Sequence, residues 1–413
     1  MEIQEILCNN KFMNNKTIIV ALSCIDSRSS GFIMRSALEY ASKHGDYDYL
    51  VITPEDSGKP HSFVVSDALL SKPLLFLDKC INKLSKPEDG FRSPILSLKL
   101  VKEIKKMING YSRIIFHIHS LHHIPYSFVP VLRFIKKHNY PCVYTFHDVW
   151  PFTGGCYNFE QHGCNGIEKR CKKCAFGYKK AHKLYKIKIK LLLKMKNLVI
   201  APVSNYCKKS LLKTELKDKR IEVVNVETNV KRLAPKEDLR KSLGIKENEK
   251  VIISVCAYWC SLKGVEYIYE LAKKLPKDYK LLIVGNNFDA TGYNNIIHLP
   301  FLDNLKELPY YFNISDAFAS VTQGDNFPLV LVEAQCCGVP VVGFGHGGTP
   351  EEVSPKSGLM VGTDNNVDKL VEALIDTCEN HPFKEEDIVA NGELYSSGLN
   401  NKKYFDIYES FKK

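Results

Sequence analysis

Two acidic residues eight positions apart mark a stretch of the chain that could do chemistry. Asp325 precedes an apolar segment that begins at Pro328, and Glu333 lies inside that segment. Proline suits the first turn of a helix because its missing N–H has no partner there, and a glycine favours the end of a helix. We therefore predict a helix over about 328–337, followed by a buried strand over 339–344.

The start of this helix has the groups that a sugar attached to a diphosphate needs. The free N–H groups of Leu329 and Val330 favour a phosphate or sugar oxygen. Asp325 and Glu333 would grip hydroxyl groups from either side. Lys263 lies in the first loop of the same half of the chain and is a point charge for a diphosphate. The alternative is an ordinary helix with a solvated glutamate and a surface lysine.

The same stretch resembles retaining glycosyltransferases of the GT-B fold, especially family 4, which carry E-x7-E, an alanine and then G-x-P-V-V. Asp325 stands where the first glutamate usually stands, and Glu333 matches the second. The resemblance implies that Glu333 holds the ribose, that Asp325 acts on the transferred sugar and that Phe327 belongs to the donor-binding set. It also implies that the leaving diphosphate is stabilised by protein groups, so that catalysis needs no metal.

Two further candidates follow predicted strands in the first half of the chain. Gly31 lies where a strand over 17–23 gives way to a helix, and His147 directly follows a strand over 142–146. Ligands bind at the carboxyl ends of strands in open parallel sheets. By resemblance, Gly31 faces the donor phosphates and the acceptor, and His147 holds the sugar or supports the leaving phosphate. The alternatives are a plain strand–helix turn and a structural histidine.

The predicted strand over 113–120 brings His117 and His119 to one face. A metal-hydrolase pair is disfavoured because the segment HIHSLHH contains no carboxylate. We expect both histidines to be polar residues that face the ligand cleft, near the acceptor.

Four cysteines lie close together in a glycine-bearing loop at 156–174: Cys156, Cys164, Cys171 and Cys174. Four thiolates make a closed tetrahedral zinc site, which would be structural rather than catalytic because no open position remains. Free thiols in a packed loop are the alternative. The opening HD-x-W-x-F-TG-x-C of this segment resembles a subgroup of family 4 enzymes linked to capsular and exopolysaccharide assembly.

A basic stretch from Lys169 to Lys213 contains no acidic residue and mixes lysine with Leu, Ile and Tyr. If this stretch forms a basic amphipathic helix, the helix can lie on an anionic membrane surface. The alternative is a helix whose lysines are simply exposed to solvent. Nucleic-acid binding is disfavoured because no RNP, KH or zinc-finger signature accompanies the stretch.

Length and composition limit the class of protein. A chain of 413 residues suits two domains, and its 45% hydrophobic content is that of a globular protein. The sequence shows neither an apolar run that would span a bilayer nor a secretory signal, so we expect a cytoplasmic protein, peripheral at the inner face of the cell membrane if the basic stretch binds lipid. The 14 cysteines are then expected to be reduced, and the net charge of +11 suits phosphorylated substrates or anionic lipid.

The resemblance covers most of the chain and implies two doubly wound parallel-sheet domains that face each other across a cleft. By this resemblance, the first spans 1–230 on the acceptor side, the second spans 231–395 and binds the nucleotide sugar, and a helix over 396–413 crosses back to the first. The predicted reaction transfers a sugar from a nucleotide-diphosphate sugar to a hydroxyl of a glycan or lipid-linked acceptor, with retention, in bacterial surface polysaccharide assembly. The alternatives are a nucleotide-sugar epimerase of the same architecture and a zinc-stabilised, basic nucleic-acid-binding protein.

Overall fold

The computed structural model divides the chain into two compact units. Unit 1 comprises Met1–Val203, Cys207–Val224 and Asn400–Lys413, and unit 2 comprises Ser204–Tyr206 and Asn225–Leu399. The residues that the structure describes are 16–26, 30–85, 88–157, 164, 166–172, 174, 177, 179–302, 305–396 and 398–412.

Unit 1 contains, within the described residues, a seven-stranded parallel sheet in the order β3-β2-β1-β4-β5-β6-β7. Its strands are β1 (Thr17–Leu22), β2 (Tyr47–Thr53), β3 (Ser62–Val64), β4 (Arg113–Ile118), β5 (Cys142–Phe146), β6 (Leu198–Pro202) and β7 (Arg220–Ile221). Its helices are α2 (Ser30–His44), α3 (Lys72–Ser85), α4 (Pro94–Met107), α5 (Phe128–Lys137), α6 (Ala181–Leu193), α7 (Asn205–Leu212) and α15 (Leu399–Ser410).

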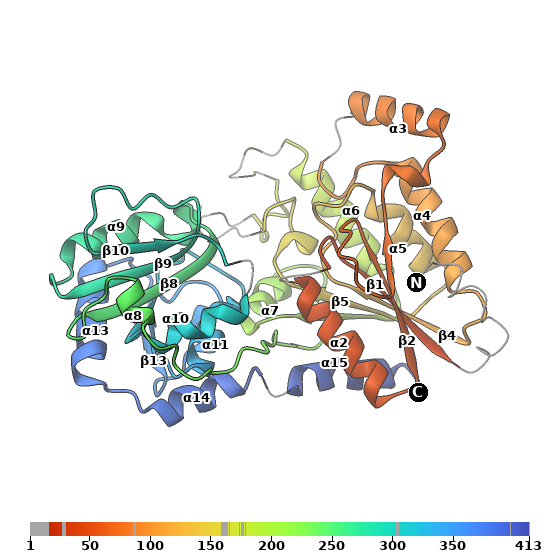
Figure 1. Cartoon of the computed structure of the whole chain (residues 1–413). Coiled ribbons are helices and arrows are strands. Elements are labelled where there is room, and N and C mark those ends of the chain that lie inside the picture. The colour runs from red at the N-terminus through yellow and green to blue at the C-terminus, as the bar shows by residue number, and fades with distance from the viewer. Residues whose placement is uncertain are drawn as a thin grey trace. The chain divides into compact units, whose positions relative to one another are not determined.

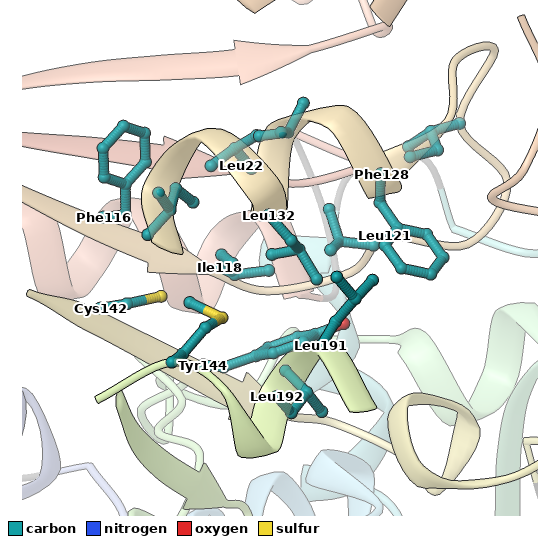
Figure 2. Packing of buried hydrophobic residues seen from close by; sticks show 14 of the residues in the cluster. Leu22, Phe116, Ile118, Leu121, Phe128, Leu132, Cys142, Tyr144, Leu191 and Leu192 are labelled. Atoms are coloured by element: carbon teal, nitrogen blue, oxygen red, sulfur yellow. The ribbon is translucent and has the colours of Figure 1, made fainter. Parts of the chain in front are cut away.

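Both faces of this sheet are covered because its strands are apolar on both sides. In β1, Leu22 faces the core formed with α4, α5 and α6, whereas Ile19 faces the core formed with α2 and α15. Figure 2 shows the first core, where Phe128 and Leu132 of α5 pack against the strands beside Leu191 and Leu192 of α6. This two-sided burial explains why the strands read as continuous hydrophobic runs.

The C-terminal helix α15 is part of unit 1 although it is the last element of the chain. It lies beside α2, the first described helix (Figure 1), and Asn401 Nδ2 donates a hydrogen bond to Ser36 Oγ at 3.0 Å. Tyr404 and Tyr408 are buried against the sheet. The end of the chain therefore completes one layer of the first unit.

Unit 2 contains a six-stranded parallel sheet, again within the described residues, in the order β10-β9-β8-β11-β12-β13. Its strands are β8 (Lys250–Tyr258), β9 (Tyr279–Asn286), β10 (Ile296–Leu299), β11 (Ala317–Ser320), β12 (Val341–Gly343) and β13 (Gly358–Met360). Its helices are α8 (Leu239–Ser242), α9 (Val265–Lys274), α10 (Leu308–Asn313), α11 (Leu329–Cys336), α12 (Thr349–Glu352), α13 (Val367–Asn380) and α14 (Glu385–Glu393).

Apolar cores cover both faces of this second sheet as well. Leu271 of α9 and Leu374 of α13 pack on one face, and Phe312 of α10 and Leu331 of α11 pack on the other. Two doubly wound parallel sheets confirm the predicted fold class. In each sheet the strand order reverses once, between β1 and β4 and between β8 and β11. Such switch points are where open α/β sheets bind ligands.

The structure corrects the predicted helix boundary at Pro328. The backbone of Pro328 is extended, with ψ 97°, so this residue precedes α11 instead of opening it. The helix ends just before Gly338, which has the left-handed φ of 81° that favours glycine. The strand expected after residue 338 is shorter than predicted and is confined to β12.

Candidate functional site

The loops at the switch point of unit 2 bring Lys263 and Asp325 into contact. Lys263 follows β8 and Asp325 follows β11, and the Lys263 Nζ lies 2.7 Å from Asp325 Oδ2. Gly264 makes this approach possible: its φ is 76°, and a Cβ there would lie 2.0 Å from the carbonyl oxygen of Val321. Any larger residue would push the two loops apart.

The carboxylate of Asp325 is held in place by its own loop. Its Oδ1 accepts a hydrogen bond from the N–H of Asn326 at 2.8 Å. Its backbone carbonyl accepts from the N–H of Gly348 at 2.7 Å, and a Cβ on Gly347 would lie 2.2 Å from that carbonyl oxygen. The two glycines therefore allow the loop after β12 to support the acid. The nearby Asp325 carboxylate raises the pKa of Lys263, which keeps the lysine charged.

The start of α11, four residues after Asp325, offers further donors. The N–H groups of Leu329 and Val330 donate to no acceptor within the described part of the chain, as expected for the first turn of a helix. Glu333 lies further along α11, where Thr228 Oγ1 donates to Glu333 Oε1 at 3.2 Å. Burial raises the pKa of Glu333 to about 7. The carboxylate is thus poised to change charge near neutral pH.

The position of the Phe327 side chain is explained by packing. Its side chain is buried, and its ring lies 5.3 Å from that of Tyr395 at an interplanar angle of 68°. This edge-to-face contact anchors the segment before α11. A direct role for Phe327 in donor binding stays a prediction.

The sequence analysis missed Glu352, the second glutamate of the segment TPEE. Glu352 is 0% exposed, and neither carboxylate oxygen has a hydrogen-bond partner among the described residues. Burial, together with the charges of Asp325 and Glu351, raises its pKa well above the usual range. A neutral carboxyl group therefore lies beneath the Asp325 loop. The only signal in the sequence is an acid next to an apolar strand-like segment, which is too weak to single it out.

In unit 1, Gly31 is the second residue of α2, which begins at the switch point between β1 and β4. Its neighbour Ser30 contacts Ser120, which follows β4, with 3.3 Å between the two hydroxyl oxygens. A Cβ on Gly31 would lie 2.6 Å from the carbonyl oxygen of Ile25, so the loop after β1 packs directly on this glycine. Packing gives a sufficient reason for glycine here, and contact with a donor phosphate stays a prediction.

His147 pairs with a second histidine. Its Nε2 lies 2.9 Å from Nδ1 of His119, and burial lowers the pKa of His147 to about 3, so the ring is neutral at physiological pH. His119 is also neutral, and its Nε2 has no partner among the described residues. A buried N–H without an acceptor is rarer than an unprotonated nitrogen without a donor, so we leave His119 Nε2 unprotonated and place the proton of this ring on Nδ1. His119 Nδ1 then donates to His147 Nε2. The neutral ring of His147 therefore carries its own proton on Nδ1, which can act as a donor.

We expected His117 and His119 to face the ligand cleft, but the structure places both side chains in the interior of unit 1. Both are buried, and Tyr408 OH lies 2.6 Å from His117 Nδ1. His117 Nε2 contacts Thr145 Oγ1 at 2.9 Å, and that oxygen lies 2.9 Å from Tyr404 OH. The expectation that both face the cleft was wrong because both side chains are buried, and α15, distant in sequence, covers His117 on this face of the sheet. His119 instead acts as the support for His147.

The four cysteines of the loop at 156–174 come together around one small cavity of about 10 Å³, which is also lined by Gly154 and Gly166. Cys171 is buried, and the other three are partly buried. In the part of the chain that the structure describes, no three His, Cys, Asp or Glu side chains are already arranged as a metal-holding group. The predicted zinc ligands are thus neighbours in space, and metal binding stays a prediction.

Family models match both halves of the chain. Residues 35–225 match the model described as Glycosyltransferase Family 4, and residues 235–394 match the model described as glycosyl transferases group 1. An uncharacterized 41.2 kDa protein in the cps region of Klebsiella pneumoniae is 27% identical over 292 residues, which are 68% of this chain and 74% of that protein. The putative colanic acid biosynthesis glycosyl transferase WcaC of Escherichia coli (strain K12) is 26% identical over 276 residues, 63% of this chain and 66% of that protein.

A solved structure agrees with this assignment at the level of the fold. The crystal structure of Anabaena HepE in complex with UDP-glucose has a TM-score of 0.67 at 14% identity and covers 95% of this chain and 99% of its own. Two doubly wound sheets, two adjoining family models and these relatives together identify the protein as a glycosyltransferase with the GT-B fold, similar to family 4.

Proposed function

We propose that this glycosyltransferase moves a sugar from a nucleotide-diphosphate sugar to a hydroxyl of a glycan or lipid-linked acceptor, with retention, in bacterial surface polysaccharide assembly. The observation that carries the proposal is the Lys263–Asp325 pair at the switch point of unit 2, followed within five residues by the donor N–H groups at the start of α11. The names of the Klebsiella and E. coli relatives support a role in polysaccharide assembly. The UDP-glucose bound to Anabaena HepE supports the class of donor.

The proposed roles follow the charges that change during transfer. The sugar becomes oxocarbenium-like while negative charge grows on the leaving diphosphate. Lys263 and the N–H groups of Leu329 and Val330 stabilise that charge, because preorganised donors act most strongly where charge develops. Glu333 binds the ribose hydroxyls, and Asp325 acts on the transferred sugar. His147 donates from Nδ1 to a sugar or phosphate oxygen.

A panel of nucleotide sugars, screened for thermal stabilisation of the purified protein, tests the proposal and identifies the donor. A ligand at 100 times its Kd stabilises the native state by about 2.7 kcal/mol, which such an assay resolves. We expect one nucleotide sugar to stabilise the protein more than its free nucleotide does. A protein that responds to no member of the panel contradicts the proposal. An epimerase would convert the bound donor without an acceptor, whereas a transferase would leave it intact apart from slow hydrolysis.

Replacement of Asp325 by asparagine is expected to lower sugar transfer about tenfold or more, because a charged hydrogen bond to the transferred sugar is lost. Affinity for the free nucleoside diphosphate should not fall and is expected to rise, since Lys263 loses its ion-pair partner. Transfer rates and calorimetric binding of the free nucleotide measure the two effects. If both fall together, Asp325 acts on the nucleotide and its proposed role is wrong.

We also propose that unit 1 docks on an anionic membrane, where a lipid-linked acceptor would lie. Four lysines of the basic stretch are exposed along and just after α6: Lys183, Lys186, Lys190 and Lys194. Most apolar residues of α6 are packed in the core and only Leu193 at its end is exposed, at 42%, which corrects the expectation that the apolar side of this helix would enter the lipid. Exposed apolar side chains lie instead on α3, where Phe76 is 73% and Leu84 is 86% exposed. The end of α3 approaches the start of α6, since Nζ of Lys180, the residue before α6, donates to the carbonyl of Ser85 at 3.4 Å.

In co-sedimentation with vesicles that contain anionic lipid, we expect the protein to bind and the binding to weaken as salt is added. Each basic residue near the surface should contribute roughly 1 kcal/mol of attraction at low salt. Replacing the four α6 lysines by glutamine should remove this salt-dependent part. Replacing Phe76 and Leu84 by serine should weaken binding that persists at high salt. Wild-type protein that stays in the supernatant at low salt contradicts membrane docking and leaves the transferase assignment untouched.

No helix in the described ranges has the length and apolar content that a membrane crossing requires.

A further inference from the structure

The cysteine cluster, formed by Cys156, Cys164, Cys171 and Cys174, surrounds a single small cavity in unit 1. The sulfurs are close enough to interact electrostatically: Cys156 with Cys171 and Cys164, and Cys171 with Cys164 and Cys174. A Cβ on Gly166 would lie 2.9 Å from the Cys164 sulfur, which shows how closely the loop wraps the cluster. The loop thus presents four sulfurs to one space.

The backbone already supplies a donor to this cluster. The N–H of Gly154 points at the Cys171 sulfur, with 3.2 Å between nitrogen and sulfur. Gly154 is packed so tightly on the start of α6 that a Cβ there would lie 2.6 Å from the Cβ of Ala181. Such N–H groups favour a thiolate over a neutral thiol because they are oriented dipoles next to the sulfur.

A buried lysine lies beside the cluster. Lys188 of α6 is 2% exposed, donates a hydrogen bond to the carbonyl oxygen of Trp150, and holds its Nζ 3.8 Å from the centre of the Trp150 ring. It forms no ion pair with any carboxylate in the described ranges, although Asp89 and Asp148 are near enough to interact. Cys156 and Cys171 are among its electrostatic neighbours. A buried ammonium group is costly unless negative charge lies near it, and thiolates in the cluster would add to the charge of Asp89 and Asp148, whereas neutral thiols would add none.

We propose that the cysteine cluster binds one Zn²⁺ through four thiolates, and that Lys188 is the buried counter-charge of this site. Binding replaces four S–H bonds by four Zn–S bonds, and the four protons pass to solvent. The product carries a net charge of −2, which the Lys188 ammonium and the Gly154 N–H partly compensate. As they stand, the sulfurs do not form a metal-holding group, so binding would draw the loop together.

This site has a structural consequence for the proposed active site, although it does not depend on the proposed function. The segment that supplies Gly154 and Cys156 begins a few residues after His147. Lys188 is bonded to the Trp150 carbonyl in that same segment. A closed zinc site would therefore hold the backbone that follows His147, without taking part in the transfer reaction.

Metal analysis of the full-length protein, purified without chelator, tests the site directly. We expect about one zinc per chain, following the four-thiolate rule. Exchange with Co²⁺ should then give the intense sulfur-to-metal charge-transfer bands and the visible bands of a tetrahedral cobalt–thiolate site. Cys171→Ser and Cys174→Ser should each lose the metal, whereas the matched variant Cys80→Ser, at a cysteine on α3 outside the cluster, should keep it.

The counter-charge is tested by Lys188→Met, which keeps the length and apolar character of the side chain. We expect zinc affinity, measured by competition with a coloured chelator, to fall by roughly 10- to 100-fold, as for other residues that support metal ligands. Lys190→Met on the exposed side of α6 is the control and should leave the affinity unchanged. Equal zinc affinities for the wild type, Lys188→Met and Lys190→Met would overturn the role of Lys188.

Two results would overturn the zinc site itself. One is wild-type protein without zinc in which the four cysteines react as free thiols in the native state. The other is a disulfide between any two of them, seen by mass spectrometry of the unreduced protein. If a cysteine variant fails to fold, the metal content and cobalt spectrum of the wild type still decide between zinc and these alternatives.

Discussion

Replacement of Lys263 by methionine is expected to lower the rate of sugar transfer by about 100- to 1,000-fold, the usual effect of removing one preorganised group that stabilises transition-state charge. Lys263 supplies the positive charge at the switch point of unit 2, and the pKa of its ammonium is raised by Asp325, so it stays protonated in the working range. The loss should appear in kcat as well as in donor affinity, because the charge on the diphosphate grows as the glycosidic bond breaks.

The comparison with Lys273→Met separates this effect from a general loss of positive charge. Lys273 is exposed near the end of α9, and its replacement should leave the kinetics unchanged. Lys263→Arg is informative as well, because it keeps the charge but changes the shape of the donor. Normal turnover in Lys263→Met, with the fold intact, would remove Lys263 from the mechanism.

Replacement of Glu333 by glutamine is expected to weaken donor binding by roughly 10- to 100-fold over the ribose hydroxyls together, because each hydrogen bond to a charged group is worth about 1.5–3 kcal/mol, against about 0.5–1.5 kcal/mol for one to a neutral group. The effect should depend on pH. Burial raises the pKa of Glu333 to about 7, so the wild-type carboxyl group is increasingly protonated below that pH. Donor affinity of the wild type should therefore rise between about pH 6 and 8, whereas that of Glu333→Gln should stay low and flat.

Stability should change in the opposite direction from affinity. A carboxyl group whose folded pKa lies above its unfolded value of 4.5 favours folding only while it is protonated. The wild type should thus lose stability as the pH rises from about 4.5 to 7, by on the order of 1–2 kcal/mol for this partly buried group, and Glu333→Gln should not. Glu372→Gln on the exposed face of α13 is the control. Parallel stability profiles for Glu333→Gln and the wild type would contradict the shift.

A local pattern in the sequence was enough to predict the elements that carry the site. The strand at Cys142–Phe146 and the helix that carries Glu333 follow from apolar runs and from their proline and glycine boundaries. These signals act over a few residues, so they do not depend on the rest of the fold. The one-residue error at Pro328 has the same origin, because propensity does not distinguish the residue before a helix from its first residue.

The sequence also predicted the fold class, through its resemblance to GT-B enzymes and through the alternation of apolar strands with amphipathic helices, which a doubly wound parallel sheet can bury. Only the tertiary structure decided which side chains meet. Lys263 contacts Asp325 because two strands distant in the chain are neighbours at a switch point, and His119 supports His147 because β4 and β5 are adjacent. Tyr404 and Tyr408 cover His117 because the last helix returns to the first unit, and Glu352 and Lys188 are buried because the chain crosses over between distant strands. These contacts leave no local trace in the sequence. A contact across the fold requires only that each partner fit its own helix, strand or loop.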